Sequence, residues 1–147
     1  LKSYFPQLRR IRITVGYEAR AFNIEEAASL IYTHPRLLSL QEMYRVAAFY
    51  RPGTEQYREI YEIAAYHFPD DVLANINAAS AVIMAGDPVS ARQYLNKVAD
   101  DPRAWNDFGV LAYLEGDRKK AEKWFRKALG IEPEKARKNL KKMKYEE

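Results

Sequence analysis

The chain has 147 residues, no cysteine and only two histidines, which excludes disulfide scaffolds, thiolate zinc sites and cysteine nucleophiles. No apolar run approaches the ~20 residues that a membrane-spanning helix needs. The net charge of +4 divides into +4 over residues 1–22, −3 over residues 23–132 and +3 over residues 133–147, which is unlike a basic nucleic-acid surface spread over one folded face.

The first predicted element is a single strand. Apolar or small residues alternate with polar ones from Ile11 to Ala21, and a period of two is typical of a strand with one buried face. No later segment has this pattern, and an unpaired strand leaves its backbone groups unsatisfied. We therefore expect residues 1–22 to be a remnant strand and linker from a preceding domain. Pairing with a second copy, which would give a homodimer, is the alternative.

From Asn23 onward the hydrophobic period is helical. Proline, glycine and aspartate interrupt it at short intervals, and Asn23 with Glu26 forms the pattern of a capping box. Helices are predicted over residues 23–34, 40–50, 54–68, 72–85, 88–99, 102–115, 118–131 and 134–145. Because short connections place successive helices antiparallel, the sequence predicts a stack of helical hairpins.

The segment from Pro102 to Lys135 has the strongest internal pattern. Its Gly116-Asp117 turn repeats Gly86-Asp87 at a spacing of thirty residues. Large and small residues follow a fixed order in its two helices: Trp105, Phe108, Gly109 and Ala112, then Ala121, Phe125, Ala128 and Pro133. This pattern resembles a tetratricopeptide repeat, a pair of antiparallel helices in which small residues permit a close crossing.

The resemblance implies an all-α fold, a tetratricopeptide-like right-handed solenoid with one N-terminal orphan β-strand. We expect a helical repeat domain over residues 23–147. Its parts are a half-repeat at 23–35, repeats at about 40–71, 72–101 and 102–135, and a capping helix at 136–147. The middle repeat departs from the family pattern, because Asn75 replaces its first large residue.

A second resemblance lies in residues 4–15. The Arg9-Arg10 pair before an alternating segment resembles the last strand of the outer-membrane-protein-A-like peptidoglycan-binding domain. The resemblance implies a Gram-negative cell-envelope protein, periplasmic or outer-membrane-associated, of which this chain is the C-terminal part. None of that domain's ligand-binding residues lies in the sequence.

Tetratricopeptide repeats bind extended peptides or partner helices along the concave face of their first helices. The resemblance places these residues on that face: Tyr44, Ala48, Ile76, Ser80, Ile83, Met84, Asn106, Val110, Tyr113 and Leu114. Most are apolar, which indicates a non-catalytic site for a protein or peptide partner; burial of the same residues as core is the alternative. The lysines and asparagines that clamp a carboxylate in some repeats are replaced, so we expect an apolar or mixed ligand.

Other functions have weaker support in the sequence. His34 and His67 lie near helix ends, and the Asp70-Asp71 and Asp100-Asp101 pairs precede helices as N-caps do, so we expect no enzyme, metal or cofactor. Ala136, Leu140 and Met143 form the apolar stripe of a capping helix whose lysines face water. A structural spacer or self-association domain and polyanion binding through the basic ends remain as alternatives.

Overall fold

The computed structural model describes residues 20–145, which form eight α-helices and two short 3₁₀ helices. In chain order these are α1 (Ile24–Thr33), η1 (Pro35–Leu37), α2 (Leu40–Ala47), α3 (Glu55–His67), α4 (Val72–Met84), α5 (Pro88–Asn96), η2 (Pro102–Ala104), α6 (Trp105–Leu114), α7 (Arg118–Ala128) and α8 (Pro133–Tyr145). The described part of the chain is thus all-α. The predicted strand lies outside it except for Arg20 and Ala21, which have no regular secondary structure.

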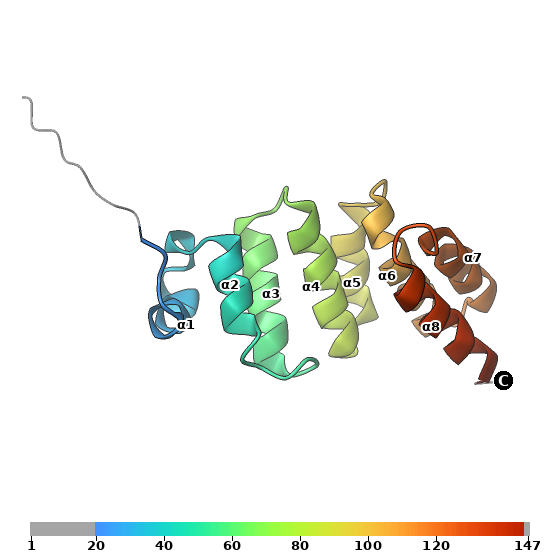
Figure 1. The fold of residues 1–147 in the computed structure, drawn as a ribbon, viewed down its shortest axis with the longest axis horizontal. Coiled ribbons are helices and arrows are strands. Elements are labelled where there is room, and N and C mark those ends of the chain that lie inside the picture. Colours follow the sequence, from blue (N-terminus) through green and yellow to red (C-terminus); the bar gives the residue numbers. More distant parts are fainter. Residues whose placement is uncertain (1–19, 146–147) are drawn as a thin grey trace, which may run out of the picture.

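Successive helices pack against one another in chain order, so the molecule is elongated, with α1 and α8 at opposite ends (Figure 1). The pairs α4–α5 and α6–α7 have the most extensive contacts. Helix α6 also contacts α4 on one side and α8 on the other. Three helices that are not consecutive in the sequence therefore form one row.

The predicted starts of four helices are confirmed by side-chain caps. Asn23 and Glu26 form the capping box of α1, and the carboxylates of Asp71, Asp87 and Asp117 accept hydrogen bonds from backbone N–H groups in the first turns of α4, α5 and α7. These caps fix where each helix begins by local interactions alone.

The two Gly-Asp turns have nearly the same backbone conformation. Gly86 and Gly116 have φ angles of 82° and 84°, in the left-handed region that favours glycine. The preceding residues, Ala85 and Glu115, both have φ −82° and ψ −1°. At these two turns the repeat in sequence is therefore accompanied by a repeat in backbone conformation.

The last hairpin is packed as its large and small residues predict. Phe125 is buried, and a Cβ added to Gly109 would lie 2.5 Å from two ring carbons of Phe125. Phe108 stacks on Trp124 with ring centroids 5.0 Å apart. Gly109 thus lets α6 and α7 approach closely, as small residues do at helix crossings.

Asn75 has a different role from the large residue that it replaces. Its side chain is buried at the start of α4, and its Nδ2 donates to the carbonyl oxygens of Pro69 and Asp71 at 2.8 and 2.9 Å. It therefore stabilises the loop before α4 by hydrogen bonds instead of filling a gap between helices.

Several helices are shorter than predicted. Helix α2 ends at Ala47 instead of residue 50, α5 at Asn96 instead of 99, and α7 at Ala128 instead of 131. After each end the backbone makes bonds across three residues, such as Tyr50 N–H to the Ala47 carbonyl. Such bonds satisfy the terminal carbonyls in a tighter turn. Residues 102–104, predicted as part of a helix, form η2, and α8 begins at Pro133, one residue before the predicted start at 134.

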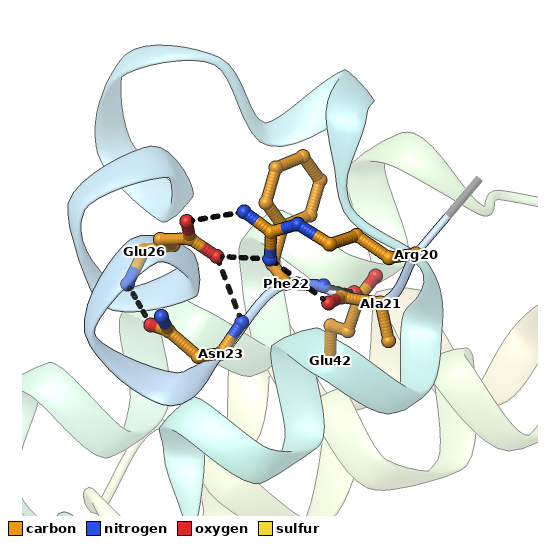
Figure 2. A network of polar contacts seen from close by, with 6 residues as sticks. All are labelled: Arg20, Ala21, Phe22, Asn23, Glu26 and Glu42. Carbon is orange, nitrogen blue, oxygen red and sulfur yellow. Dashed lines mark hydrogen bonds and ion pairs between the residues drawn. The ribbon is translucent and has the colours of Figure 1, made fainter. Parts of the chain in front are cut away.

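A polar network fastens the segment before α1 (Figure 2). The Phe22 N–H donates to Oε1 of Glu42 at 2.7 Å, and Oε2 of Glu42 accepts from the N–H and hydroxyl of Ser39. Hydrogen bonds from Ser39 lower the pKa of Glu42, which is only 8% exposed. On the exposed side, the Arg20 guanidinium bonds Glu26 and, with the Asn23 N–H, lowers the pKa of that carboxyl to about 2. Glu42 thus joins α2 to the start of α1.

Candidate binding cleft

A cleft of about 780 Å³ lies between α4, α6 and α8. Each helix contributes residues spaced three or four apart, which share one face of a helix. The lining residues are Ser80, Ile83 and Met84 from α4, Asn106, Asp107 and Val110 from α6, and Lys135, Lys138, Asn139, Lys141, Lys142 and Tyr145 from α8. Helix α6 contacts both α4 and α8, so it forms the middle of the cleft.

Two of the three walls contribute apolar side chains. Met84 is 55% exposed at the end of α4, while Ile83 and Val110 are partly buried beside it. An exposed methionine can adapt to ligands of different shape, because its side chain is unbranched and flexible. The α4 and α6 side of the cleft therefore suits an apolar group of a ligand.

Asp107 is the acidic group of the cleft. Its carboxylate accepts a hydrogen bond from the Ser80 hydroxyl at 2.9 Å, which links α6 to α4. Burial raises the pKa of Asp107 to about 6, against the opposing effects of the Ser80 hydrogen bond and the positive charge of Lys135. Near neutral pH the cleft therefore contains one carboxylate whose ionised form is destabilised by burial.

Asn106 was predicted to face a ligand, but the structure gives it another contact. It is only 6% exposed, and its Oδ1 accepts a hydrogen bond from Nδ2 of Asn139 at 2.9 Å. This bond joins α6 to α8. Asn106 therefore positions the α8 wall and offers little surface of its own.

The α8 wall is basic. Lys135, Lys138, Lys141 and Lys142 line the cleft from this helix, and the Lys141 ammonium lies 5.8 Å from the Tyr145 ring centroid. Lys135 also forms an ion pair with Glu132 at 2.6 Å. Ala136 and Met143 are buried, as predicted for a capping stripe. The lysines are exposed, as predicted, but the sequence did not place them beside the expected binding face.

Five of the ten predicted face residues line this cleft: Ser80, Ile83, Met84, Asn106 and Val110. Ile76 does not, because it is only 7% exposed and belongs to the core. Tyr44 packs against the core of α1–α3 with its ring centroid 5.2 Å from that of Tyr61. Ala48 caps the C-terminus of α2, and Tyr113 packs partly buried against the core of the last helices. Leu114 is exposed outside the cleft.

The structure also brings in residues that the sequence analysis did not assign to the face. These are Asp107, Asn139 and Tyr145 together with four lysines of α8, Lys135, Lys138, Lys141 and Lys142. Asp107 had a usable signal, since it is the one charged residue of α6 and comes directly after a predicted face position. Within residues 20–145, no three His, Asp or Glu side chains converge as metal ligands would. None of the helices described there has the length and apolar character needed to cross a bilayer.

Comparisons with models of known protein families, with curated proteins and with solved structures find no match to this chain. The repeat pattern and the geometry of the cleft are therefore the basis for any functional assignment.

Proposed function

We propose that residues 23–145 form a tetratricopeptide-type right-handed solenoid whose cleft binds an extended segment of a protein partner without catalysing a reaction. The pattern of large and small residues around Gly109 and the matching Gly-Asp turns support the repeat assignment. In this arrangement α4 and α6 are the first helices of two repeats, and α8 closes the end. The likeness of residues 4–15 to an envelope domain supports placing these helices after such a domain in a cell-envelope protein.

The observation that carries the binding proposal is the apolar surface of Ile83, Met84 and Val110 inside a cleft of about 780 Å³. A protein gains stability by burying such side chains, so apolar surface left in a concave cleft marks a place for a ligand. The concave shape admits an extended chain or one helix more readily than a flat protein face.

Met84→Asp tests this proposal with Val89→Asp as the control. Met84 and Val89 are both exposed apolar residues, 55% and 70% exposed, but only Met84 lines the cleft. A displayed library of random peptides is selected on the wild-type protein, and the enriched peptides are measured against both variants. We expect Met84→Asp to weaken binding about tenfold or more, because a charged group replaces the apolar contact.

Val89→Asp is expected to retain wild-type affinity, and circular dichroism establishes that both variants keep their helices. Equal losses in the two variants, or enriched peptides that tolerate Met84→Asp, would contradict a ligand site in this cleft.

A further inference from the structure

We propose that the cleft selects an acidic segment that also carries an apolar side chain, with the carboxylates on the α8 lysines and the apolar group on the α4 and α6 walls. This inference rests on the proposed function and adds the chemistry of the ligand. It follows from the separation of charged and apolar groups within one cleft.

The charge of the lining strongly favours an anionic ligand. Four lysines line the cleft and one acidic side chain, Asp107, opposes them. Asp107 is already engaged, since it accepts the Ser80 hydroxyl and lies close enough to Lys135 for the two charges to interact. The lysines toward the C-terminal end of α8 are exposed at the rim, where positive charges steer an acidic ligand and determine its orientation.

The lysine spacing also suits an extended acidic chain. Lys138, Lys141 and Lys142 follow one side of α8 over little more than one helical turn, a rise of about 6 Å. Alternate side chains of an extended peptide on one face are about 7 Å apart. Two acidic side chains of such a peptide can therefore reach this wall while the intervening residue points at Met84 and Val110.

Phosphate-bearing surfaces fit the cleft less well. Tyr145 is the aromatic residue of the lining, and its ring lies by the Lys141 ammonium, whereas proteins that bind single strands offer several aromatic platforms for base stacking. A lipid bilayer is flat on this scale and could touch only the exposed lysines. Neither ligand would use the apolar surface around Met84.

The test compares two charge-reversal pairs. Lys138→Glu with Lys141→Glu changes the α8 wall, and Lys120→Glu with Lys123→Glu changes exposed lysines on α7 that do not line the cleft. Both double substitutions lower the net charge of the chain equally. A difference between their peptide affinities therefore reports the local effect of the cleft lysines and not the effect of overall charge. The probe is a fluorescent peptide of aspartates and glutamates flanking leucines, and its counterpart has asparagine and glutamine instead of the acids.

We expect the acidic peptide to bind the wild-type protein at least about tenfold more tightly than its amide counterpart at low ionic strength, with the difference falling as salt is added. The α8 pair should weaken acidic-peptide binding about tenfold or more, and the α7 pair should change it little. Met84→Asp should weaken binding of the same peptide, because the apolar wall is shared.

Three results overturn the inference: no binding of the acidic peptide, equal binding of the amide peptide, or equal losses in the two charge-reversal pairs. Binding of phosphatidylglycerol vesicles or oligodeoxythymidine that depends on Lys138 and Lys141, without peptide binding, also overturns it. If the peptides selected from the random library lose affinity in Met84→Asp but are neutral or basic, the proposed function stands and only the preference for an acidic ligand is wrong. If no binding depends on Met84, the proposed function fails as well.

Discussion

The N-terminal part of the described chain, residues 20–71, and the C-terminal part, residues 72–145, build helical hairpins with different interactions. In the C-terminal part, backbone turns at Gly86 and Gly116 repeat with nearly the same conformation. In the N-terminal part, the turn before α3 contains Pro52 and Gly53, and a buried carboxylate and a group of tyrosines add side-chain contacts. Glu42 bonds the segment before α1, and Tyr44, Tyr57 and Tyr61 form a chain of ring contacts.

This difference bears on where a ligand can bind. Tyr44 was expected on the same face as Ser80 and Val110, but its ring packs against Tyr61 and the core of α1–α3. On α4 and α6, the close crossings are made by alanines and Gly109, so the larger side chains at their edges are not all needed for the core. The surface that we propose as a binding site therefore lies in the C-terminal part, on α4, α6 and α8.

Gly109→Ala is the substitution with the largest expected effect, because it tests the close helix crossing of the C-terminal part. The added Cβ would lie 2.5 Å from the Phe125 ring, which cannot move freely because it is buried. We expect the free energy of unfolding to fall by about 3 kcal/mol, which exceeds the gain of about 1 kcal/mol from alanine's helix propensity. Urea denaturation measures the change.

Gly130→Ala is its control, since the nearest atom to a Cβ there is a carbonyl oxygen at 3.9 Å. We expect a change within about 0.5 kcal/mol at this site. A small effect of Gly109→Ala would mean that α6 and α7 can separate at little cost, and the contrast between the two parts would lose its physical basis.

Each part contains one acidic residue with a shifted pKa, Asp107 in the C-terminal part and Glu42 in the N-terminal part. Their contributions to the free energy of unfolding should change with pH in opposite directions. Burial raises the pKa of Asp107 to about 6, so wild-type stability falls as pH rises from about 4 through 6. Asp107→Asn can keep the Ser80 hydrogen bond and removes this fall, and we expect it to stabilise the fold by about 2 kcal/mol at pH 8. The gain should vanish below about pH 3, where the wild-type carboxyl is protonated in both the folded and the unfolded state.

Glu42→Gln should act in the other direction. Hydrogen bonds from Ser39 lower the pKa of Glu42, so its ionised form stabilises the fold above the ordinary pKa of glutamate and this contribution is lost as pH falls through the lowered value. We expect a loss of about 1 kcal/mol near neutral pH that shrinks in acid. Denaturation curves of both variants across pH measure this; shifts of the same sign would refute the contrast.

The features predicted correctly from the sequence depend on neighbours in the chain. Asn23, Asp71, Asp87 and Asp117 cap helices through backbone N–H groups three residues away, and Gly116 adopts its turn for local steric reasons. Helix ends were predicted less well, because the exit from α-helix to a tighter turn has no single residue that marks it.

The lining of the cleft could be predicted only in part, because the contacts that bring its residues together link positions far apart in the chain. The Ser80–Asp107 and Asn106–Asn139 bonds join residues 27 and 33 positions apart, and they depend on how closely the helices approach. The apolar stripe of Ala136 and Met143 indicates which side of α8 is buried. This stripe does not determine which of the α8 lysines face α6, because that depends on the angle at which α8 crosses α6.

The smallest expected effects on stability are those of alanine substitutions at the glycine turns, which both parts contain. Gly53, Gly86 and Gly116 have φ angles of 87°, 82° and 84°, a region where a Cβ costs about 1 kcal/mol. Alanine at Gly86 or Gly116 should therefore lower the free energy of unfolding by about 1 kcal/mol, equally at the two sites, since no atom lies within 4 Å of the added Cβ. Thermal denaturation of the three single variants gives the comparison.

Gly53→Ala should cost slightly more, because its Cβ would lie 3.4 Å from the Met84 carbonyl oxygen at the end of α4. This contact joins the turn of the N-terminal part to the helix that forms one wall of the cleft. If Gly53→Ala also weakens peptide binding while Gly86→Ala and Gly116→Ala do not, the position of Met84 depends on both parts of the molecule. Equal binding by all three variants would confine the site to residues 72–145.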